Sequence, residues 1–325
     1  MIKTEKLTMT YKNGFTAVKN LNLNVSEGDV FGFLGPNGAG KTTTIRMLTG
    51  LLKPTSGIVL INNYDVASNE NEIKKIIGVV PESHGYYNWM TGEEYLNYFA
   101  ELFNQDKVKS KKHIEYLLEK VGLSDKKKVL IGHYSRGMKQ RLGIAKALVN
   151  NPKIIFLDEP TLGLDPIGQK DIQNLIFEIN RVMNVTVFIT SHLLKDIEVL
   201  CNRVCIVQNG KLIEQGTIKE LQTKYSENQI IKIKTSNNKR AYEYFKDIKM
   251  ILNTEIKEDY LYLYMHKASD TNLINEAKRY IVEKLFINSI DILEIGKEET
   301  TIEDIFFKLT DNKAKGGKID ESINN

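Results

Sequence analysis

The chain has 325 residues, of which 42% are apolar and 26% charged, and its 45 basic and 41 acidic residues leave a net charge of +4. These values are ordinary for soluble globular proteins and exclude a fibrous or wholly disordered chain. The charge is too small and too evenly mixed to indicate nucleic acid, and we expect no nucleic-acid partner. Because the length exceeds the usual size of one hydrophobic core, we expect a main domain and a smaller one.

No segment has the composition of a membrane span or an export signal. Apolar runs stay shorter than the roughly 18 to 20 residues that cross a bilayer, and the start MIKTEKLTMTYKNG lacks the apolar stretch of a signal peptide. We therefore expect the chain by itself to be neither inserted nor exported. Cys201 and Cys205 provide no disulfide framework, which fits a reducing cytosol. A metal site would need a second pair of ligands, so we interpret both as small buried residues.

Short continuous apolar runs alternate with helical patterns over the first two thirds of the chain. Such runs predict parallel strands that are covered by helices on both faces of the sheet. The predicted strands are 30–35 (VFGFLG), 76–80 (IIGVV), 154–159 (IIFLDE), 185–190 (VTVFIT) and 204–210 (VCIVQNG). The sequence therefore predicts an α/β domain over residues 1–225.

Residues 83–150 interrupt this pattern with helical segments alone. The stretches 91–103 and 111–123 both place apolar residues three and four positions apart, which is typical of amphipathic helices. Thr91 and Glu94 have the spacing of a capping box at the start of the first helix. We expect a helical insertion within the α/β domain.

The composition changes near Tyr225, and a second pattern occupies residues 226–310. Strands and helices follow in the order β-α-β-β-α-β, with one more helix at 301–310. This order predicts a small α+β domain of the split βαβ type. The tail 311–325 has few residues to bury, and we expect it to be disordered.

The motif GPNGAGKT at 35–42 carries the strongest chemical signal. It fits G-x-x-x-x-G-K-[ST] and lies between an apolar strand and a helical segment, as a phosphate-binding loop does. The glycines let the backbone wrap a phosphate chain, and amides at a helix N-terminus attract the anion. Lys41 can reach the β- and γ-phosphates, and the Thr42 hydroxyl can bind Mg²⁺. The predicted nucleotide-binding residues of this segment are Gly35, Pro36, Asn37, Gly38, Ala39, Gly40, Lys41, Thr42 and Thr43.

Two adjacent carboxylates, Asp158 and Glu159, end the strand IIFLDE. Ligands of parallel sheets bind at the carboxyl ends of the strands, so both side chains should lie beside the phosphates. We expect Asp158 to be an outer-sphere ligand of Mg²⁺ and Glu159 to be the base that orients the attacking water. Taken alone, the pair could be a solvated turn after a core strand, but the phosphate loop makes that alternative weaker.

Further segments follow in an order that resembles the nucleotide-binding subunits of ABC transporters. YSRGMKQRL at 134–142 looks like the signature of that family, LGLDP at 162–166 looks like its D-loop, and TSHLL at 190–194 looks like its switch region. The resemblance covers about residues 2–220. The residues that it implies as functional are Ser135 and Gly137 for nucleotide, Asp165 in the D-loop, His192 as catalytic histidine and Tyr11 as the ring that stacks on adenine.

Two positions depart from the pattern of that family. The usual Leu-Ser-Gly-Gly-Gln of the signature is replaced by Tyr134 to Met138, and the glutamine of the Q-loop is replaced by Glu82. A carboxylate can still offer oxygen to Mg²⁺, but it adds negative charge near phosphate and cannot donate as an amide does. The proline and glutamate there, with GMKQRL after Ser135, resemble the branch that exports drugs, antibiotics and lipids.

The resemblance implies a P-loop ATPase that binds ATP and Mg²⁺ and couples hydrolysis to a separately encoded transmembrane permease. It acts with a second ATPase subunit, which is a copy of the chain in a homodimer or a related chain in a heterodimer. The site would then lie at the cytoplasmic face of the cell membrane. His192 would contact the γ-phosphate or the water, and Ser135 would present its hydroxyl to the ATP of the partner, although it could equally be a simple N-cap.

The aromatic group Tyr86, Tyr87, Trp89 and Met90 falls where the resemblance puts the groove for a helix of the permease. It could equally be core of the helical insertion.

A soluble ATPase of the same superfamily that acts on nucleic acid or ribosomes is the main rival function. DNA-repair members insert a long coiled coil between the phosphate loop and the signature, and this chain has no room for one. Ribosome-acting members carry two cassettes, whereas this chain has one phosphate loop. A regulatory module without turnover would lack Lys41 or Glu159, and both are present.

Overall fold

The computed structural model describes residues 1–83, 85–226, 228–248, 250–266 and 271–315. They form two compact units, Met1–Ile218 together with the segment from Leu309, and Lys219–Lys308. The expected boundary after residue 225 lies close to this division, but α8 (Ile218–Tyr225) falls almost wholly in the second unit. Among the described residues, no helix is both long enough and apolar enough to cross a membrane.

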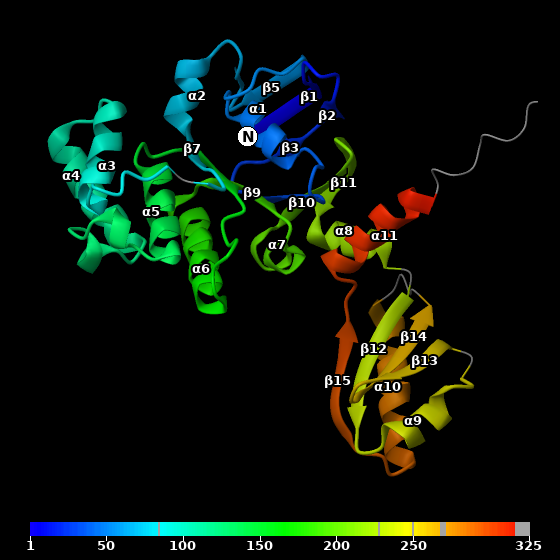
Figure 1. The fold of residues 1–325 in the computed structure, drawn as a ribbon. Coiled ribbons are helices and arrows are strands. Elements are labelled where there is room, and N and C mark those ends of the chain that lie inside the picture. The colour runs from blue at the N-terminus through cyan, green and yellow to red at the C-terminus, as the bar shows by residue number, and fades with distance from the viewer. Residues whose placement is uncertain (84, 227, 249, 267–270, 316–325) are drawn as a thin grey trace, which may run out of the picture. The chain divides into compact units, whose positions relative to one another are not determined.

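A six-stranded sheet forms the centre of the first unit (Figure 1). In spatial order its strands are β11 (Lys211–Thr217), β10 (Arg203–Gln208), β4 (Val30–Leu34), β9 (Thr186–Ser191), β8 (Ile154–Asp158) and β7 (Ile77–Val80). All neighbours are parallel except β11, which pairs antiparallel with β10. Every residue of β4, β8 and β9 is buried, as expected for a sheet covered on both faces. The predicted parallel sheet is confirmed.

Phe188 lies at the centre of the core on β9. Its ring is 5.5 to 5.6 Å, between centroids, from the rings of Phe31, Phe33 and Phe156 on the adjacent strands β4 and β8. This packing fixes β4 and β8 on either side of β9. The loops at the carboxyl ends of these three strands therefore meet at one edge of the sheet.

A second sheet in this unit, which the sequence analysis did not anticipate, is antiparallel. Its strands are β2 (Thr16–Leu21), β1 (Ile2–Thr10), β5 (Ser56–Ile61) and β6 (Tyr64–Asp65) in that order, with β3 (Asn24–Val25) paired to β1. β1 alternates partly between buried and exposed positions and carries polar side chains outward. Its apolar residues reach the same core as β4 and α1 (Lys41–Leu48). The remaining helices of the core are α2 (Glu70–Ile76), α6 (Pro166–Met183) and α7 (Leu194–Leu200).

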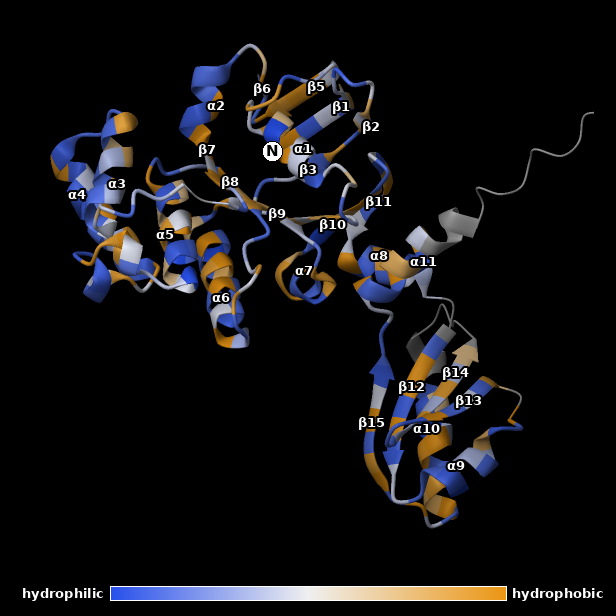
Figure 2. Cartoon of the chain, viewed as in Figure 1, coloured by the Kyte–Doolittle hydropathy of each residue, from blue (hydrophilic) through white to orange (hydrophobic). Residues whose placement is uncertain are grey.

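The helical insertion is present as predicted. It contains α3 (Gly92–Leu102), α4 (Lys107–Lys120) and α5 (Arg136–Leu148), with 3-10 turns at Ser124–Lys126 and Ile131–His133. The capping box is confirmed: Thr91 N donates to Glu94 at 2.8 Å, and Glu94 N donates to the Thr91 hydroxyl at 3.2 Å. In Figure 2 the outer helix α4 is largely hydrophilic, and its buried residues face α3 and α5.

The second unit has the predicted β-α-β-β-α-β order. Its elements are β12 (Asn228–Thr235), α9 (Asn238–Phe245), β13 (Ile251–Lys257), β14 (Tyr260–His266), α10 (Thr271–Ile287) and β15 (Ile292–Glu298). The sheet is antiparallel in the order β13-β14-β12-β15. Its core joins strand residues such as Ile231 and Leu263 to helix residues such as Ile281.

The prediction of a disordered tail over residues 311–325 is partly wrong. α11 (Ile302–Lys315) extends five residues beyond the predicted helix end, through the segment DNKAK. Thr301 and Asp304 cap its start reciprocally, and the alanine and lysines of DNKAK favour helix. Residues 316–325, the rest of that expectation, lie outside the described residues.

Candidate active site

The loop 35–40 joins β4 to α1 in a shape that requires glycine at two positions. Gly40 has a φ of +99°, and a Cβ there would lie 2.5 Å from the carbonyl oxygen of Ala17. A Cβ at Gly35 would lie 2.6 Å from the carbonyl oxygen of Val207. A side chain at either position would therefore clash with the backbone of the neighbouring segment. α1 begins at Lys41 directly after the loop, so the unpaired amides of its first turn lie beside it.

The side chain of Lys41 is folded back on this loop. The residue is 8% exposed, and Nζ donates to the carbonyl oxygens of Gly35 at 2.8 Å and Pro36 at 3.4 Å. Burial lowers the pKa of Lys41, while nearby carboxylates, with Glu159 the strongest, act in the opposite direction. Lys41 is therefore a buried cation whose charged form a bound anion would stabilise.

The predicted carboxylates stand at the end of β8. Asp158 is 5% exposed, and the Thr190 hydroxyl donates to its Oδ1. Glu159 has a φ of +53°, which is uncommon for a residue other than glycine, and its backbone N donates to the carbonyl oxygen of Thr190 at 3.1 Å. Such backbone strain is often found at functional sites.

Glu159 and His192 form a direct pair at the cavity wall. Oε2 of Glu159 lies 2.9 Å from Nδ1 of His192 and accepts from the His192 backbone N at 3.3 Å. The carboxylate side chain is 9% exposed and the imidazole 41% exposed. The ends of β8 and β9 thus bring together the two residues that the sequence analysis assigned to catalysis.

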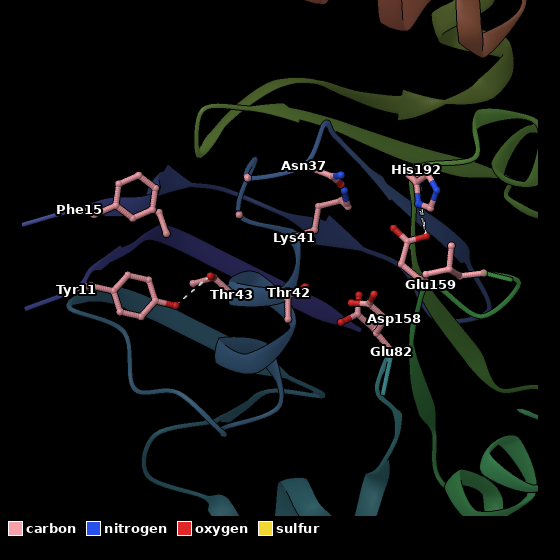
Figure 3. Close-up of a pocket in the computed structure, with 14 residues that line it drawn as sticks. Tyr11, Phe15, Asn37, Lys41, Thr42, Thr43, Glu82, Asp158, Glu159 and His192 are labelled. Atoms are coloured by element: carbon pink, nitrogen blue, oxygen red, sulfur yellow. Dashed lines mark hydrogen bonds and ion pairs between the residues drawn. The ribbon is translucent and has the colours of Figure 1, made fainter. Parts of the chain in front are cut away.

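A cavity of about 470 Å³ collects most of the predicted residues, within the roughly 300 to 1,000 Å³ typical of small-molecule sites. Figure 3 shows Lys41 between the carboxylates on one side and two aromatic rings on the other. The predicted residues that line it are Tyr11, Asn37, Gly38, Gly40, Lys41, Thr42, Thr43, Glu82, Asp158, Glu159 and His192. Gly35, Pro36 and Ala39 belong to the loop but do not line the cavity.

The sequence analysis missed Phe15, Ala17 and Leu162, which also line the cavity. Phe15 is 57% exposed, whereas Tyr11 is half-buried and its hydroxyl lies 3.1 Å from the Thr43 hydroxyl. Both rings lie at the same end of the cavity (Figure 3). The signal for Phe15 was an aromatic residue in the turn 11–15, four positions after the predicted Tyr11.

Three predicted metal ligands, Thr42, Glu82 and Asp158, line one side of this cavity. In the described part of the chain, no group of three or more His, Cys, Asp or Glu residues could hold a metal by itself. One hydroxyl and two carboxylates are hard oxygen donors of the kind that Mg²⁺ uses beside phosphates and water. The donor set therefore fits Mg²⁺ that is shared with a nucleotide.

Ser135 and Gly137 do not line the cavity of their own chain. Ser135 is the N-cap of α5, and its hydroxyl accepts from Met138 N at 3.2 Å. The guanidinium of Arg136 packs closely over Gly163 of the D-loop. A Cβ added at Gly163 would lie only 2.4 Å from it. Asp165 of the same loop caps α6 by accepting from Gly168 N at 2.8 Å.

The aromatic group of the insertion divides into a core part and an exposed part. Tyr86 donates from its hydroxyl to the carbonyl oxygen of Lys139, and burial raises its pKa. Its ring lies 5.6 Å from that of Tyr95, which is 3% exposed. Trp89 is 71% exposed and contacts the ring of Tyr87 at 5.2 Å between centroids. Tyr86 therefore belongs to the core of the insertion, whereas Trp89 is exposed, and its contact with a permease stays a prediction.

Comparisons with known proteins agree with this geometry. Residues 18–162 match the family described as ABC transporter. The chain is 41% identical over 314 residues to the bacitracin transport ATP-binding protein BcrA of Bacillus licheniformis, covering 95% of this chain and 97% of the relative. It is 31% identical to the linearmycin resistance ATP-binding protein LnrL of Bacillus subtilis, covering 95% and 98%.

Solved structures show the same fold for the first unit. CbiO1 of Clostridium perfringens, part of the ABC transporter complex cbiONQ, is 31% identical, with a TM-score of 0.63 over 68% of this chain and 89% of that chain. The dimeric bacterial ABC transporter cassette MJ0796 is 29% identical, with a TM-score of 0.61 over 67% and 98%. The chain therefore belongs to the ATP-binding proteins of ABC transporters, the subunits that bind and hydrolyse ATP.

Proposed function

We propose that this chain supplies ATP hydrolysis to a separate membrane permease that exports antibiotic peptides or related amphiphilic molecules. The observation that carries this proposal is the similarity along nearly the full length of the chain, C-terminal unit included, to proteins named for bacitracin transport and linearmycin resistance. A second bacitracin transport ATP-binding protein, BcrA of Enterococcus faecalis, is 34% identical over 95% of this chain. Transport that gives resistance moves the toxic molecule away from its target, so we infer export.

Hydrolysis would use the residues of the cavity by positioning and charge. Lys41 and the amides of its loop would hold the phosphates, and Glu159 would orient the water and accept its proton. His192, held by Glu159, would keep that carboxylate and the water in line. Thr42, Asp158 and Glu82 would hold Mg²⁺, which neutralises charge on the phosphates.

A second copy of the chain would complete the site. Ser135 and Gly137 do not line the cavity of their own chain, but the N-terminus of α5 presents a capping hydroxyl and first-turn amides. Set against the ATP of another copy, these groups would contact the γ-phosphate, and its release would weaken the pair. The dimeric cassette among the similar structures supports this arrangement.

The exposed part of the aromatic group would receive the permease. Trp89 and Tyr87 provide an accessible aromatic surface on the helical insertion, near the residues that follow Glu82. Aromatic residues are enriched at the centres of protein interfaces. Through this contact the chain would lie at the cytoplasmic face of the membrane.

The proposal is tested by expressing the chain together with its separately encoded permease in an antibiotic-sensitive bacterium. We expect the minimal inhibitory concentration of bacitracin to rise with the wild-type chain and to stay at the level of the empty host with Glu159→Gln. Bacitracin should also stimulate the ATPase of the purified complex. Equal sensitivity of all three strains, with both proteins detected in the two strains that carry their genes, would refute bacitracin as substrate. Linearmycin is then the next compound to measure.

A further inference from the structure

The chain segments that follow β8 and β9 are joined by a second contact besides the Glu159–His192 pair. The hydroxyl of Thr161 donates to Oδ2 of Asp196. Thr161 is 1% exposed and Asp196 8% exposed, so this hydrogen bond lies in the interior. Thr161 comes two residues after Glu159, and Asp196 comes four residues after His192. The loop after β8 and the segment after β9 are therefore joined once at the cavity wall and once in the interior.

Asp196 also holds a third element. Nε2 of Gln173 on α6 donates to Oδ1 of Asp196 at 3.1 Å, and Gln173 is 8% exposed. An ionised carboxylate only accepts hydrogen bonds, and here each of its oxygens accepts from a buried neutral donor. Hydrogen bonds in such a low-dielectric interior are strong, and loss of one partner leaves the other unsatisfied. Asp196 thus ties the loop after β8, the helix α6 and the start of α7 together.

The position of His192 depends on this start of α7. The imidazole is 41% exposed, so its surroundings restrain it little, and the contacts to Glu159 come from both its ring and its backbone N. The backbone N of Asp196 donates to the carbonyl oxygen of Leu193, the residue after His192, at 3.1 Å. Movement of Asp196 would therefore move the backbone that presents His192.

We propose that Asp196 is a positioning residue for ATP hydrolysis, which sets His192 against Glu159 through its hydrogen bonds to Thr161 and Gln173. This inference rests on the roles proposed above for Glu159 and His192. Catalytic groups tolerate little displacement, since a misplacement of about 1 Å can lower a rate about a hundredfold. Because α6 begins directly after the D-loop, the same hydrogen bonds connect that loop to His192.

Three substitutions separate the hydrogen bonds from the bulk of the side chain. Asp196→Leu has similar size and removes both acceptors. Asp196→Asn keeps an acceptor for Gln173, and its amide can donate to the Thr161 hydroxyl, which then accepts. Thr161→Val removes one hydrogen bond with almost no change in shape. Thr4→Val is the control for a buried threonine remote in sequence, because Thr4 is 2% exposed in the other sheet, where its hydroxyl donates to the Leu21 carbonyl at 2.9 Å and accepts from Leu23 N at 2.8 Å.

ATPase kinetics and single-turnover rates of the full chain test the proposal. We expect Asp196→Leu to lower kcat about ten- to a hundredfold, within the cost of a small misplacement, and to leave KM for ATP unchanged. Thr161→Val should act in the same direction to a smaller extent. Asp196→Asn should restore most of the rate, and Thr4→Val should leave it at the wild-type value.

A variant in the background of His192→Ala distinguishes positioning from general destabilisation. If Asp196 acts through His192, Asp196→Leu causes little further loss of single-turnover rate in that background. Should Asp196→Leu fail to fold, Thr161→Val takes its place, with the same expected result. An undiminished loss in that background, or a kcat of Asp196→Leu equal to wild type, would overturn the proposal. A wild-type rate in Glu159→Gln would instead overturn the proposed role of Glu159, which the same assay reports separately.

Discussion

One carboxylate oxygen of Glu159 receives both contacts from His192, at 2.9 Å from Nδ1 and 3.3 Å from the backbone N. Nδ1 is therefore the ring nitrogen that faces Glu159. The other ring nitrogen, Nε2, is then the atom that can face a phosphate. The pair therefore fixes both the orientation of the imidazole ring and the direction of the Glu159 side chain.

We expect Glu159→Gln to lower kcat by about 10² to 10⁴, the usual contribution of a general base. Gln keeps the size and an acceptor for His192, but it cannot take a proton from water, so ATP affinity should persist. Single-turnover hydrolysis and binding of a fluorescent ATP analogue measure the two quantities. Glu72→Gln on the surface of α2 is the control for loss of one charge. Loss of ATP binding together with the rate would assign Glu159 to the phosphate site and not to the base.

Lys41→Met should abolish the stabilisation that ATP gives to the chain. ATP at a hundred times its Kd stabilises a single site by about 2.7 kcal/mol, which thermal unfolding with and without Mg-ATP detects. We expect a clear rise of Tm for the wild type and none for Lys41→Met, because the variant lacks the buried cation beside the loop carbonyls. A wild-type rise of Tm in the variant would refute the assignment of the phosphate loop.

The same variant gives a dependence on pH. Burial lowers the pKa of Lys41 below its ordinary value of 10.5, so the folded chain binds this proton less well than the unfolded chain. Folding with a charged, buried Lys41 lowers the free energy of unfolding. This loss of stability is fully present below the lowered pKa and disappears as the pH rises to 10.5. Without nucleotide, the wild type should therefore gain stability relative to Lys41→Met between neutral pH and pH 10.5. A constant difference in unfolding free energy across this range would contradict the lowered pKa.

The carboxyl ends of the parallel strands were the part of the site most accessible to prediction. Asp158, Glu159 and His192 each follow a continuous apolar run, and ligand sites of parallel sheets form where such runs end. The phosphate loop was similarly visible, because strand, glycines, Lys41 and helix follow one another in the sequence. Local order along the chain carried these predictions.

Other parts of the molecule depend on contacts that local patterns do not contain. β3 and β6 have only two residues each, and β1 has six polar and only three apolar residues, so the antiparallel sheet had no distinct hydrophobic period in the sequence. The hydrogen bond between Thr161 and Asp196 joins residues 35 positions apart, and each residue alone resembles an ordinary loop or helix position. A role for Phe15 can be recognised only from the cavity that it lines.

Phe15 should contribute to nucleotide affinity along with Tyr11. Its ring is largely exposed at the mouth of the cavity, whereas the ring of Tyr11 is half-buried and held through its hydroxyl by Thr43. Stacking of a base on an aromatic ring contributes about 1 to 3 kcal/mol, so Phe15→Ala should raise Kd for ATP about five- to 150-fold. Phe15→Tyr should restore affinity. Unchanged affinity in Phe15→Ala, with a large loss in Tyr11→Ala, would assign adenine to Tyr11 alone.

Trp89 and Tyr86 should respond in opposite ways to the same substitution. Trp89 is 71% exposed, so Trp89→Glu should keep Tm and basal ATPase while lowering the amount of permease that co-purifies with the chain. Tyr86→Glu should lower Tm, because a charge would replace a half-buried hydroxyl that donates to backbone. Undiminished co-purification with Trp89→Glu would exclude Trp89 from the interface with the permease.

A chain that ends at Tyr225 should fold and bind ATP, because every residue that lines the cavity precedes residue 193 and lies in the first compact unit. It should nevertheless unfold at a lower temperature than the full chain. The segment from Leu309 belongs to the same unit, and Nε2 of Gln208 donates to the carbonyl oxygen of Thr310 at 3.4 Å. Truncation therefore removes a small part of the ATPase unit along with the C-terminal one.

Calorimetry and thermal unfolding of the truncated chain separate these two consequences. ATP affinity should equal that of the full chain, because neither the phosphate loop nor the carboxylates lose a contact that the structure shows. Lys41→Met in the truncated chain should remove the response to ATP, which places the binding at the same loop. Since Thr310 is 9% exposed, the lower Tm should follow from lost packing of its segment, and mutation of Gln208 to Ala in the full chain should reproduce only part of it. An insoluble product, or one that binds no ATP, would show that the ATPase unit needs residues 226–325 in order to fold.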